Sequence, residues 1–186
     1  MSGIRVGALT WEVSEWGESF FPQDLPDEWR LPYYANEFHT VVIDMDSLIQ
    51  EDIDGLSDMV MDCHEEFRVI LKTTDFKASK NLIQALIDNI DQSGNDCIAG
   101  VWHYLPASAN ETLKPVIDDP KAVEGSPRPA LLTIDLEADL RGIAGKVREF
   151  LDRHDEHSDR YIIATSGYED IQKLRQLVEI IRLTAS

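Results

Sequence analysis

The sequence predicts a parallel α/β domain that extends over residues 1–186. Short β-branched, apolar segments alternate along the chain with segments of helical periodicity, which indicates a repeated strand–helix unit. Several of the strand segments are apolar on both faces, as buried parallel strands are. Such repeats form either an open doubly wound sheet or a β/α barrel. Length alone favours the open sheet, because a full eight-unit barrel typically needs about 250 residues.

The predicted strands share a short run of apolar residues bounded by polar or turn residues. They cover residues 4–10, 39–45, 67–74, 97–105, 130–136 and 160–165. The predicted helices carry apolar residues at intervals of three and four. Their apolar stripes run through residues 31–38, 53–63, 82–90, 140–151 and 171–181. Residues 110–129 are rich in proline and are expected to form a long loop.

The charge of the chain restricts its partners. There are 35 Asp and Glu against 17 Lys and Arg, which gives a formal net charge of -18. This balance argues against a partner that is a nucleic acid or an anionic membrane. Cys63 and Cys97 fit no ligand or redox spacing and are interpreted as reduced, packed thiols. With no signal-peptide pattern and no membrane-length apolar run, the expected location is the cytoplasm.

Residues 4–45 resemble a known family. The matching features are the glycine strand Arg5-Val6-Gly7, the Trp11 and Trp16 pair, the Phe20-Phe21-Pro22 turn, and a helix–strand pair that runs from Leu31 through Tyr33-Tyr34-Ala35 and Phe38 to Thr40-Val41 and Ile43. This pattern resembles the opening of the YecE-like family, domain of unknown function family 72. The segment FRVILK at residues 67–72 and the Leu105-Pro106 pair resemble later family motifs. The resemblance implies a TIM-like β/α barrel.

The chain also departs from the family pattern. Val42, Asp44 and Tyr104 stand where the family carries Glu, Asn and Gln, and the segment 161–167 lacks the family's Arg and His. The chain is short for the family, so the predicted fold is a reduced or incomplete TIM-like parallel barrel, with the open doubly wound sheet as the alternative. A shortened barrel leaves strand edges or apolar helix faces to cover, which makes a homodimer plausible. The family has no established reaction that the resemblance could transfer.

The candidate catalytic residues are Lys72, Asp44 and Asp135. In barrels and open sheets alike, functional groups gather at the carboxyl ends of the strands, where these residues are expected. A lysine in a mostly apolar strand is a candidate base or imine former, because desolvation lowers its pKa. The alternative is a lysine paired with Asp44 or Asp135, or one whose ammonium reaches solvent at the strand end. A divalent-cation site formed by Asp44, Asp46, Asp135 and Glu137 with His103 has no diagnostic spacing, so no metal ligand and no cofactor is assigned.

The candidate ligand-binding residues are Trp11, His103, Tyr104, Ser166 and Gly167. Trp11 is able either to stack on a sugar or base or to pack a long loop onto the barrel. Ser166 and Gly167 precede the last helix, where they form either an anion site or a capping box of the form S-x-x-E. The sequence therefore predicts a protein that binds or converts a small polar metabolite, sugar-like or phosphorylated. The alternative is a non-catalytic binding or interaction module, and the residues leave open whether the protein is an enzyme.

Overall fold

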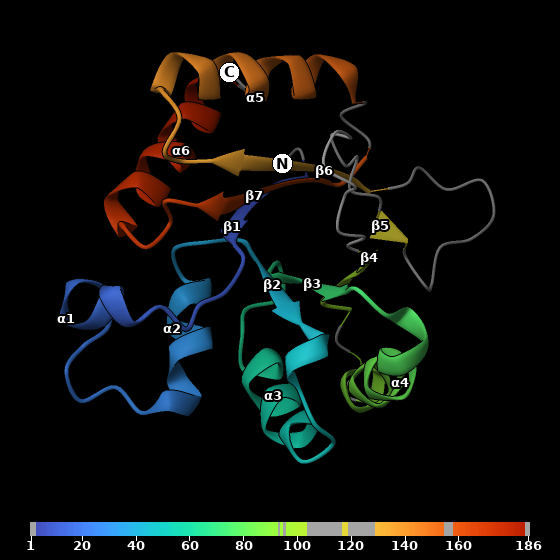
Figure 1. Cartoon of the computed structure of the whole chain (residues 1–186). Coiled ribbons are helices and arrows are strands. Elements are labelled where there is room, and N and C mark those ends of the chain that lie inside the picture. The colour runs from blue at the N-terminus through green and yellow to red at the C-terminus, as the bar shows by residue number, and fades with distance from the viewer. Residues whose placement is uncertain are drawn as a thin grey trace.

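The computed structural model describes residues 3–92, 94, 96–103, 117–118, 129–154 and 158–184. All the strands belong to one seven-stranded sheet, and six of them are parallel (Figure 1). The strands are β1 (Ile4–Ala8), β2 (Thr40–Asp44), β3 (Arg68–Thr73), β4 (Ile98–His103), β5 (Ile117–Asp118), β6 (Ala130–Asp135) and β7 (Arg160–Ser166). The six predicted strands are confirmed. The two-residue β5, which pairs antiparallel with β4, was not predicted and lies within the expected loop.

The strand order β5-β4-β3-β2-β1-β7-β6 shows why the sheet is a curled half-barrel and not a doubly wound sheet. Each step from β1 to β4, and the step from β6 to β7, moves across the sheet in the same direction. Because parallel crossovers are right-handed, steps in one direction place all their helices on one face. A doubly wound sheet reverses direction at a switch point, which this sheet does not have among its described strands. The prediction of an incomplete TIM-like barrel is therefore confirmed.

The first and last strands of the chain lie side by side. β1 pairs with β7 over five residues, from Ile4 opposite Arg160 to Ala8 opposite Ala164. In the described part of the chain, β6 pairs only with β7, so the opening of the half-barrel lies between β4–β5 and β6. Any reduction relative to a complete barrel is therefore in the middle of the chain.

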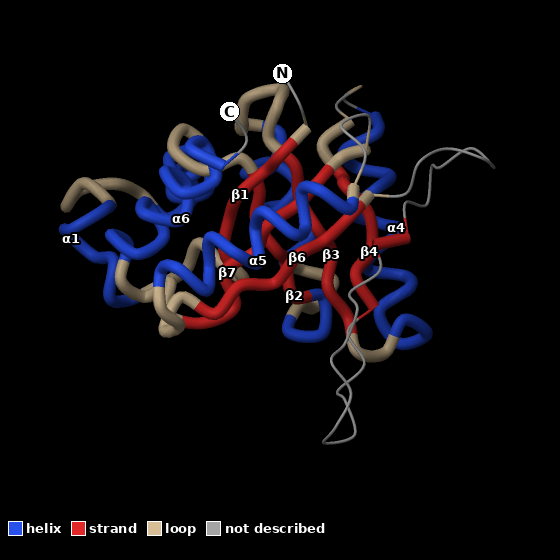
Figure 2. Tube along the Cα trace, turned by 90° about the horizontal axis from the view of Figure 1, so that it is seen from above, coloured by secondary structure: helices blue, strands red, loops and turns tan. Residues whose placement is uncertain are grey.

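The helices cover the convex face of the sheet (Figures 1 and 2). The longer ones are α2 (Arg30–Ala35), α3 (Asp52–Met61), α4 (Phe76–Gln92), α5 (Leu140–Arg153) and α6 (Ile171–Thr184). Each overlaps a predicted apolar stripe, although α2 and α3 end before Phe38 and Cys63, the last residues of their stripes. Their buried residues join the outward side chains of the strands in one large core. Three short helices between β1 and α2 were not predicted: η1 (Ser14–Trp16), α1 (Gly17–Phe20) and η2 (Asp27–Trp29). A fourth, η3 (Met45–Ser47), follows β2.

A second, smaller cluster lies on the concave face. It contains Val42, Ile70, Leu131, Tyr161 and Ile163, which alternate with the convex-facing residues of their strands. All five are less than 9% exposed. The strands are apolar on both faces because one face packs in the large core and the other in the smaller cluster.

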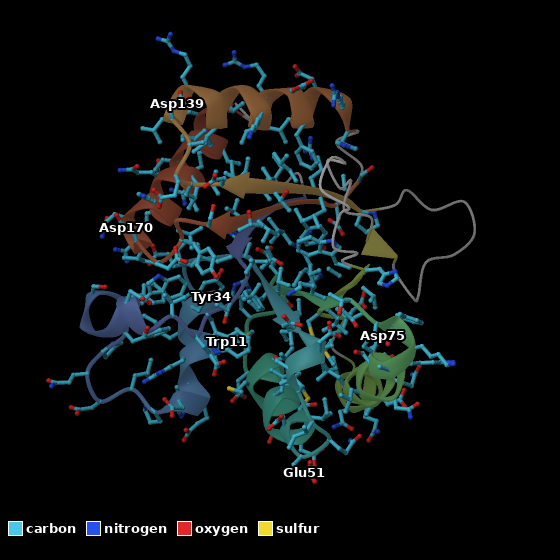
Figure 3. The ribbon with its side chains drawn as sticks, viewed as in Figure 1. Trp11, Tyr34, Glu51, Asp75, Asp139 and Asp170 are labelled. Carbon is cyan, nitrogen blue, oxygen red and sulfur yellow. The ribbon has the colours of Figure 1, made fainter. Side chains whose placement is uncertain are left out.

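Acidic residues begin three of the helices that follow strands. The side chains of Asp75, Asp139 and Asp170 accept hydrogen bonds from backbone N–H groups in the first turns of α4, α5 and α6, at 2.9 to 3.0 Å. Figure 3 shows these three residues at the starts of their helices. It also labels Glu51, the acidic residue directly before α3. A carboxylate at this position satisfies orphan N–H groups and interacts favourably with the helix dipole. Part of the acidic excess therefore stabilises helix N-termini.

The crossing from β1 to β2 is held by Tyr34, which is fully buried (Figure 3). Its hydroxyl accepts a hydrogen bond from the backbone N–H of Ala8 and donates one to the backbone carbonyl of Thr40, each at 3.0 Å. Gly7 makes this approach possible, because a Cβ atom there would lie 1.7 Å from the Thr40 oxygen. Gly7 and Tyr34, both in the family-like segment, therefore act together to hold β1 against β2.

Both cysteines are buried thiols, as expected. Burial raises the pKa of the Cys63 thiol to about 12, with smaller contributions from Cys97 and Asp62, so this thiol stays protonated and unreactive at neutral pH. No helix in the described part of the chain is long and apolar enough to cross a membrane.

We expect Tyr34→Phe to lower the free energy of unfolding by about 1–3 kcal/mol, because it leaves a buried N–H and a buried carbonyl without their partner. Urea denaturation measures the loss. The matched control is Tyr33→Phe, because the Tyr33 side chain next to it is 37% exposed; surface changes of this kind usually cost less than about 0.5 kcal/mol. Equal losses in the two variants would show that the hydroxyl does not hold the junction.

We also expect stability to fall as the pH drops from 6.5 towards 5, in part through His39. Burial lowers the pKa of His39, and the charges of His64, Arg182 and Arg5 lower it further, against an opposing contribution from Glu66. Because the folded state has the lower pKa, the unfolded chain takes up the proton first, and stability that is complete above pH 6.5 is lost below it. Urea unfolding of the parent and of His39→Gln at pH 7.5 and pH 5.5 measures this. The variant should lose less stability between the two pH values than the parent.

Candidate functional site

The candidate site is centred on an ion pair at the carboxyl ends of two neighbouring strands. Asp44 ends β2 and lies opposite Lys72 of β3 in the parallel register. Both residues lie two positions after concave-face residues, Val42 and Ile70, so both side chains extend from the concave face. The Lys72 Nζ atom donates a hydrogen bond to Asp44 Oδ2 at 2.6 Å. Of the pairings that the sequence allowed for Lys72, the one with Asp44 is present.

The two members of the pair differ in exposure. The Lys72 side chain is 19% exposed and the Asp44 side chain is 42% exposed. The ammonium is thus held below the surface while the carboxylate remains open to solvent. At this end of the sheet, the Asp44 carboxylate is therefore the more accessible hydrogen-bond acceptor, and the Lys72 ammonium is the less accessible donor.

Asp46, just beyond β2, holds the neighbouring loops in place. Its carboxylate accepts hydrogen bonds from Thr73 Oγ1 at 2.5 Å, from the Thr74 backbone and hydroxyl at 2.7 and 2.6 Å, and from Ser79 Oγ at 2.9 Å. Burial alone would raise the pKa of Asp46, but these donors together lower it well below its usual range. The carboxylate therefore fastens the end of β2 to the end of β3 and to the first turn of α4.

Thr73 and Ser79 were not recognised as site residues from the sequence. Their only signal was their position, one directly beside Lys72 and the other in the next helical turn. Both are buried, and Thr73 donates a hydrogen bond to Asp46 as described above. They act as positioning residues, because their contacts orient the loop that follows Asp44.

A second polar group lies at the ends of β6 and β7. Ser166 donates a hydrogen bond from its hydroxyl to Asp135, and the backbone N–H of Glu137 donates to the same carboxylate at 2.8 Å. These two hydrogen bonds lower the pKa of Asp135. Glu137 in turn pairs with Lys173 of α6 at 2.7 Å. In the strand order, β1 and β7 stand between Asp44 and Asp135.

The turn at Gly167 is built for close packing. Its φ of +69° is in the left-handed region that glycine adopts readily. A Cβ atom there would lie 2.8 Å from Glu137 Oε1 and 3.0 Å from the Leu136 side chain. The predicted capping box from Ser166 to Glu169 is wrong, because α6 begins at Ile171 and is capped by Asp170. With the carboxylates of Asp135 and Glu137 beside this turn, the charges there oppose a bound anion.

Both tryptophans of the family-like segment pack inside the molecule. Trp11 is 7% exposed and Trp16 is fully buried. The Trp16 ring is stacked on Tyr34 with centroids 5.8 Å apart, and its Nε1 donates to the backbone carbonyl of Tyr168 at 2.8 Å. Of the two interpretations of Trp11, the structure has the packed one, which leaves little of the ring for stacking on a ligand.

His103, another predicted ligand residue, ends β4. His103 is exposed and stands opposite Thr73 in the register. Tyr104 lies outside the described residues. Apart from Trp11, the predicted site residues that the structure describes thus form two groups, one at β2–β4 and one at β6–β7. Within the described ranges, no three His, Cys, Asp or Glu side chains are arranged to hold a metal ion.

Comparison with known proteins finds relatives of the fold. No family model matches the chain, and no curated protein matches it. Among solved structures, a DUF72 family protein from Thermotoga maritima MSB8 is similar, with a TM-score of 0.64 and 12% identity over 96% of this chain and 99% of that chain. A DUF72 family protein from Enterococcus faecalis V583 is similar with a TM-score of 0.60 and 10% identity, over 98% of each chain. The chain therefore has the fold of the DUF72 family, the same family that residues 4–45 resemble in sequence.

Proposed function

We propose that the protein binds a small polar metabolite at the carboxyl ends of β2 and β3, with Lys72 and Asp44 as the binding pair. The observation that supports this most directly is the 2.6 Å ion pair, with its sheltered ammonium and open carboxylate. A pair held in this way presents a hydrogen-bond donor and an acceptor side by side, which matches adjacent hydroxyl groups of a sugar or polyol.

The surrounding charge favours a neutral ligand over a phosphorylated one. Asp46, Asp75, Asp135, Glu137 and Asp170 all lie at this same end of the parallel sheet, at strand ends or helix starts. Such a ring of carboxylates repels a phosphate approaching from solvent and leaves a neutral sugar unaffected. We therefore place sugar-like ligands before phosphorylated ones.

If the ligand is converted, the same pair provides acid–base groups. Asp44 would accept a proton from a substrate hydroxyl, and the adjacent ammonium of Lys72 would stabilise the negative charge that develops on the oxygen. Asp135 would serve as a second carboxylate, with Ser166 setting its orientation. The two buried thiols fit a reducing compartment and support the cytoplasmic location that we propose.

A second candidate is a non-catalytic interaction module with the same fold. The observation that favours it is the position of two surface hollows, both of which lie along α5 and α6 and not at the ends of β2 and β3. The packed tryptophans are consistent with this alternative, because they leave little aromatic surface for stacking on a ligand.

The proposal predicts that thermal-shift screening with neutral sugars, polyols and their phosphates will find a stabilising ligand among the neutral compounds. A ligand at about 100 times its Kd adds about 2.7 kcal/mol, or roughly 5–10 °C in Tm for a domain of this size. We expect Lys72→Met and Asp44→Asn to lose this shift. Lys173→Met is the matched control, because it breaks a lysine–carboxylate pair at the same end of the sheet, at 2.7 Å, and should keep the shift.

Two outcomes would count against the binding pair. A ligand-induced shift that survives in Lys72→Met would remove the lysine from the site. Stabilisation of the parent by phosphorylated compounds alone would contradict the electrostatic argument for a neutral ligand.

A further inference from the structure

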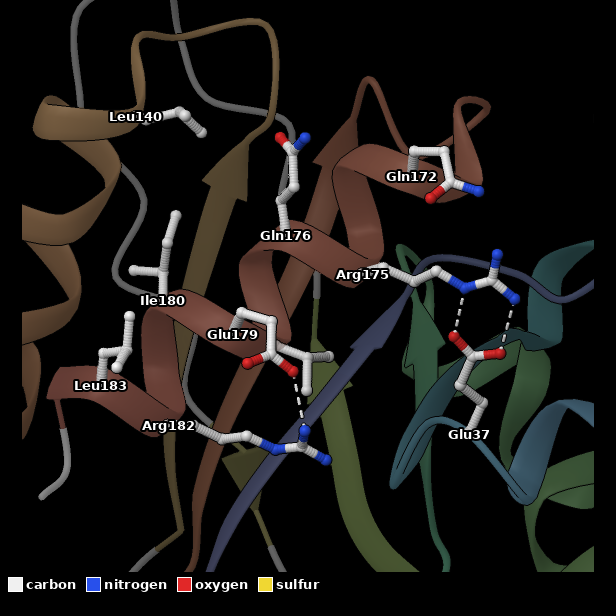
Figure 4. Close-up of a pocket in the computed structure, with 10 residues that line it drawn as sticks. Glu37, Leu140, Gln172, Arg175, Gln176, Glu179, Ile180, Arg182 and Leu183 are labelled. Atoms are coloured by element: carbon white, nitrogen blue, oxygen red, sulfur yellow. Dashed lines mark hydrogen bonds and ion pairs between the residues drawn. The ribbon is translucent and has the colours of Figure 1, made fainter.

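The surface beside α6 carries apolar residues that the half-barrel does not cover, among exposed polar ones. A hollow of about 580 Å³ runs along this helix between Glu37 and the start of α5 (Figure 4). A second hollow of about 260 Å³ continues it between α5 and α6 and shares Leu140, Gln176 and Ile180 with the first. Together they form one groove, which we call the α5–α6 groove.

Two of the large apolar side chains in this groove are unusually exposed. Leu183, in the last turn of α6, is 80% exposed, and Leu140, at the start of α5, is 56% exposed. The opposite side of α6 is already used, because Leu174, Leu177 and Ile181 are buried against the sheet. The exposed side of α6 carries Leu183 beside the polar residues Gln172, Gln176, Glu179 and Arg182. Exposed apolar side chains within a polar rim are typical of an interaction site.

The rim of the first hollow is electrically balanced, unlike the chain as a whole. Its four charged residues form two ion pairs, Arg175 with Glu37 at 2.5 Å and Arg182 with Glu179 at 2.7 Å (Figure 4). The second hollow adds Glu137, Asp139 and Lys173. The chain as a whole carries a net charge of -18. Two copies of so acidic a protein repel one another over most orientations, and a surface with equal numbers of both charges is where they can approach most closely.

We propose that the α5–α6 groove is the interface of a two-fold symmetric homodimer. A two-fold contact is self-complementary, so a surface that carries both a protruding apolar side chain and a groove to receive it can pair with its own copy. Leu183 of each copy enters the groove of the other copy, between Leu140 and Ile180. With the two α6 helices antiparallel, Arg182 of each copy faces Glu179 of the other, and both charge signs are satisfied across the axis.

The expected size of this contact sets the conditions of the test. The two helices have 14 residues each, which corresponds to about 21 Å of helix. A face of two such helices is smaller than the roughly 800 Å² per partner of a standard stable interface. We therefore expect a dissociation constant in the micromolar range, so that dimers prevail at about 200 µM protein.

Sedimentation equilibrium of the parent protein at that concentration should give twice the mass of the 21.1 kDa chain. Leu183→Glu should return the protein to the monomer, because it places a carboxylate in the apolar centre of the contact; at 80% exposure the change leaves the fold intact. Ile49→Glu is the matched control, since Ile49 is 60% exposed and lies outside the groove, before α3. A monomeric parent, or a dimer that survives Leu183→Glu, would overturn the proposal.

A charge exchange tests the symmetry of the contact. Arg182→Glu places carboxylates opposite one another across the axis and should weaken the dimer by at least about tenfold, the range measured for close interfacial charge pairs. Adding Glu179→Arg to that variant exchanges the two charges in both copies and should recover most of the association. If the double exchange remains monomeric, the antiparallel arrangement of α6 is excluded.

Discussion

The hydrogen-bonded pairing of β1 with β7 is the constraint on which the rest of the structure depends. It joins the first strand of the chain to the last and places every parallel strand in one curled sheet. Without it, β6, β7, α5 and α6 would be a separate layer, and the Asp135–Ser166 group would not share an end of the sheet with Lys72 and Asp44. The direct contact between Trp16 and the backbone of Tyr168 strengthens the same junction from the convex side. The arrangement of the candidate site and the position of the α5–α6 groove thus both depend on the pairing of β1 with β7.

Much of the strand layout could be predicted from the sequence, because the strands are apolar on both faces and bounded by polar residues. Whether they form a barrel could not be decided by length, since the winding direction depends on which strands pair, and pairing partners such as Ile4 and Arg160 are remote in sequence. The resemblance in residues 4–45 supplied that answer. The short β5 was missed, because two residues carry no periodicity.

The candidate site was predictable in part for a similar reason. Asp44 and Lys72 lie near the ends of apolar strands, so their location at the carboxyl ends, and one of their possible pairings, could be inferred. Thr73 and Ser79 gave no such signal, because a hydroxyl in an amphipathic segment is equally suited to solvent or to a buried carboxylate. Trp11 shows the converse case: the sequence left open whether its ring stacks on a ligand or packs a loop, and only its burial in the structure decides for packing.

The position of the opening in the middle of the chain also has a consequence for how the protein folds. β1 to β4 follow one another in the sequence and in the sheet, and β6 and β7 form a second pair of consecutive strands. The contacts between these two groups join residues such as Arg5 and Asp159, which are 154 positions apart. Contacts between distant residues carry a large loop-closure entropy and slow the rate-limiting step of folding. The two ends of the chain must therefore meet late, after each has formed its own strands and helices, and until then the edge of β1 remains unpaired and prone to intermolecular strand pairing.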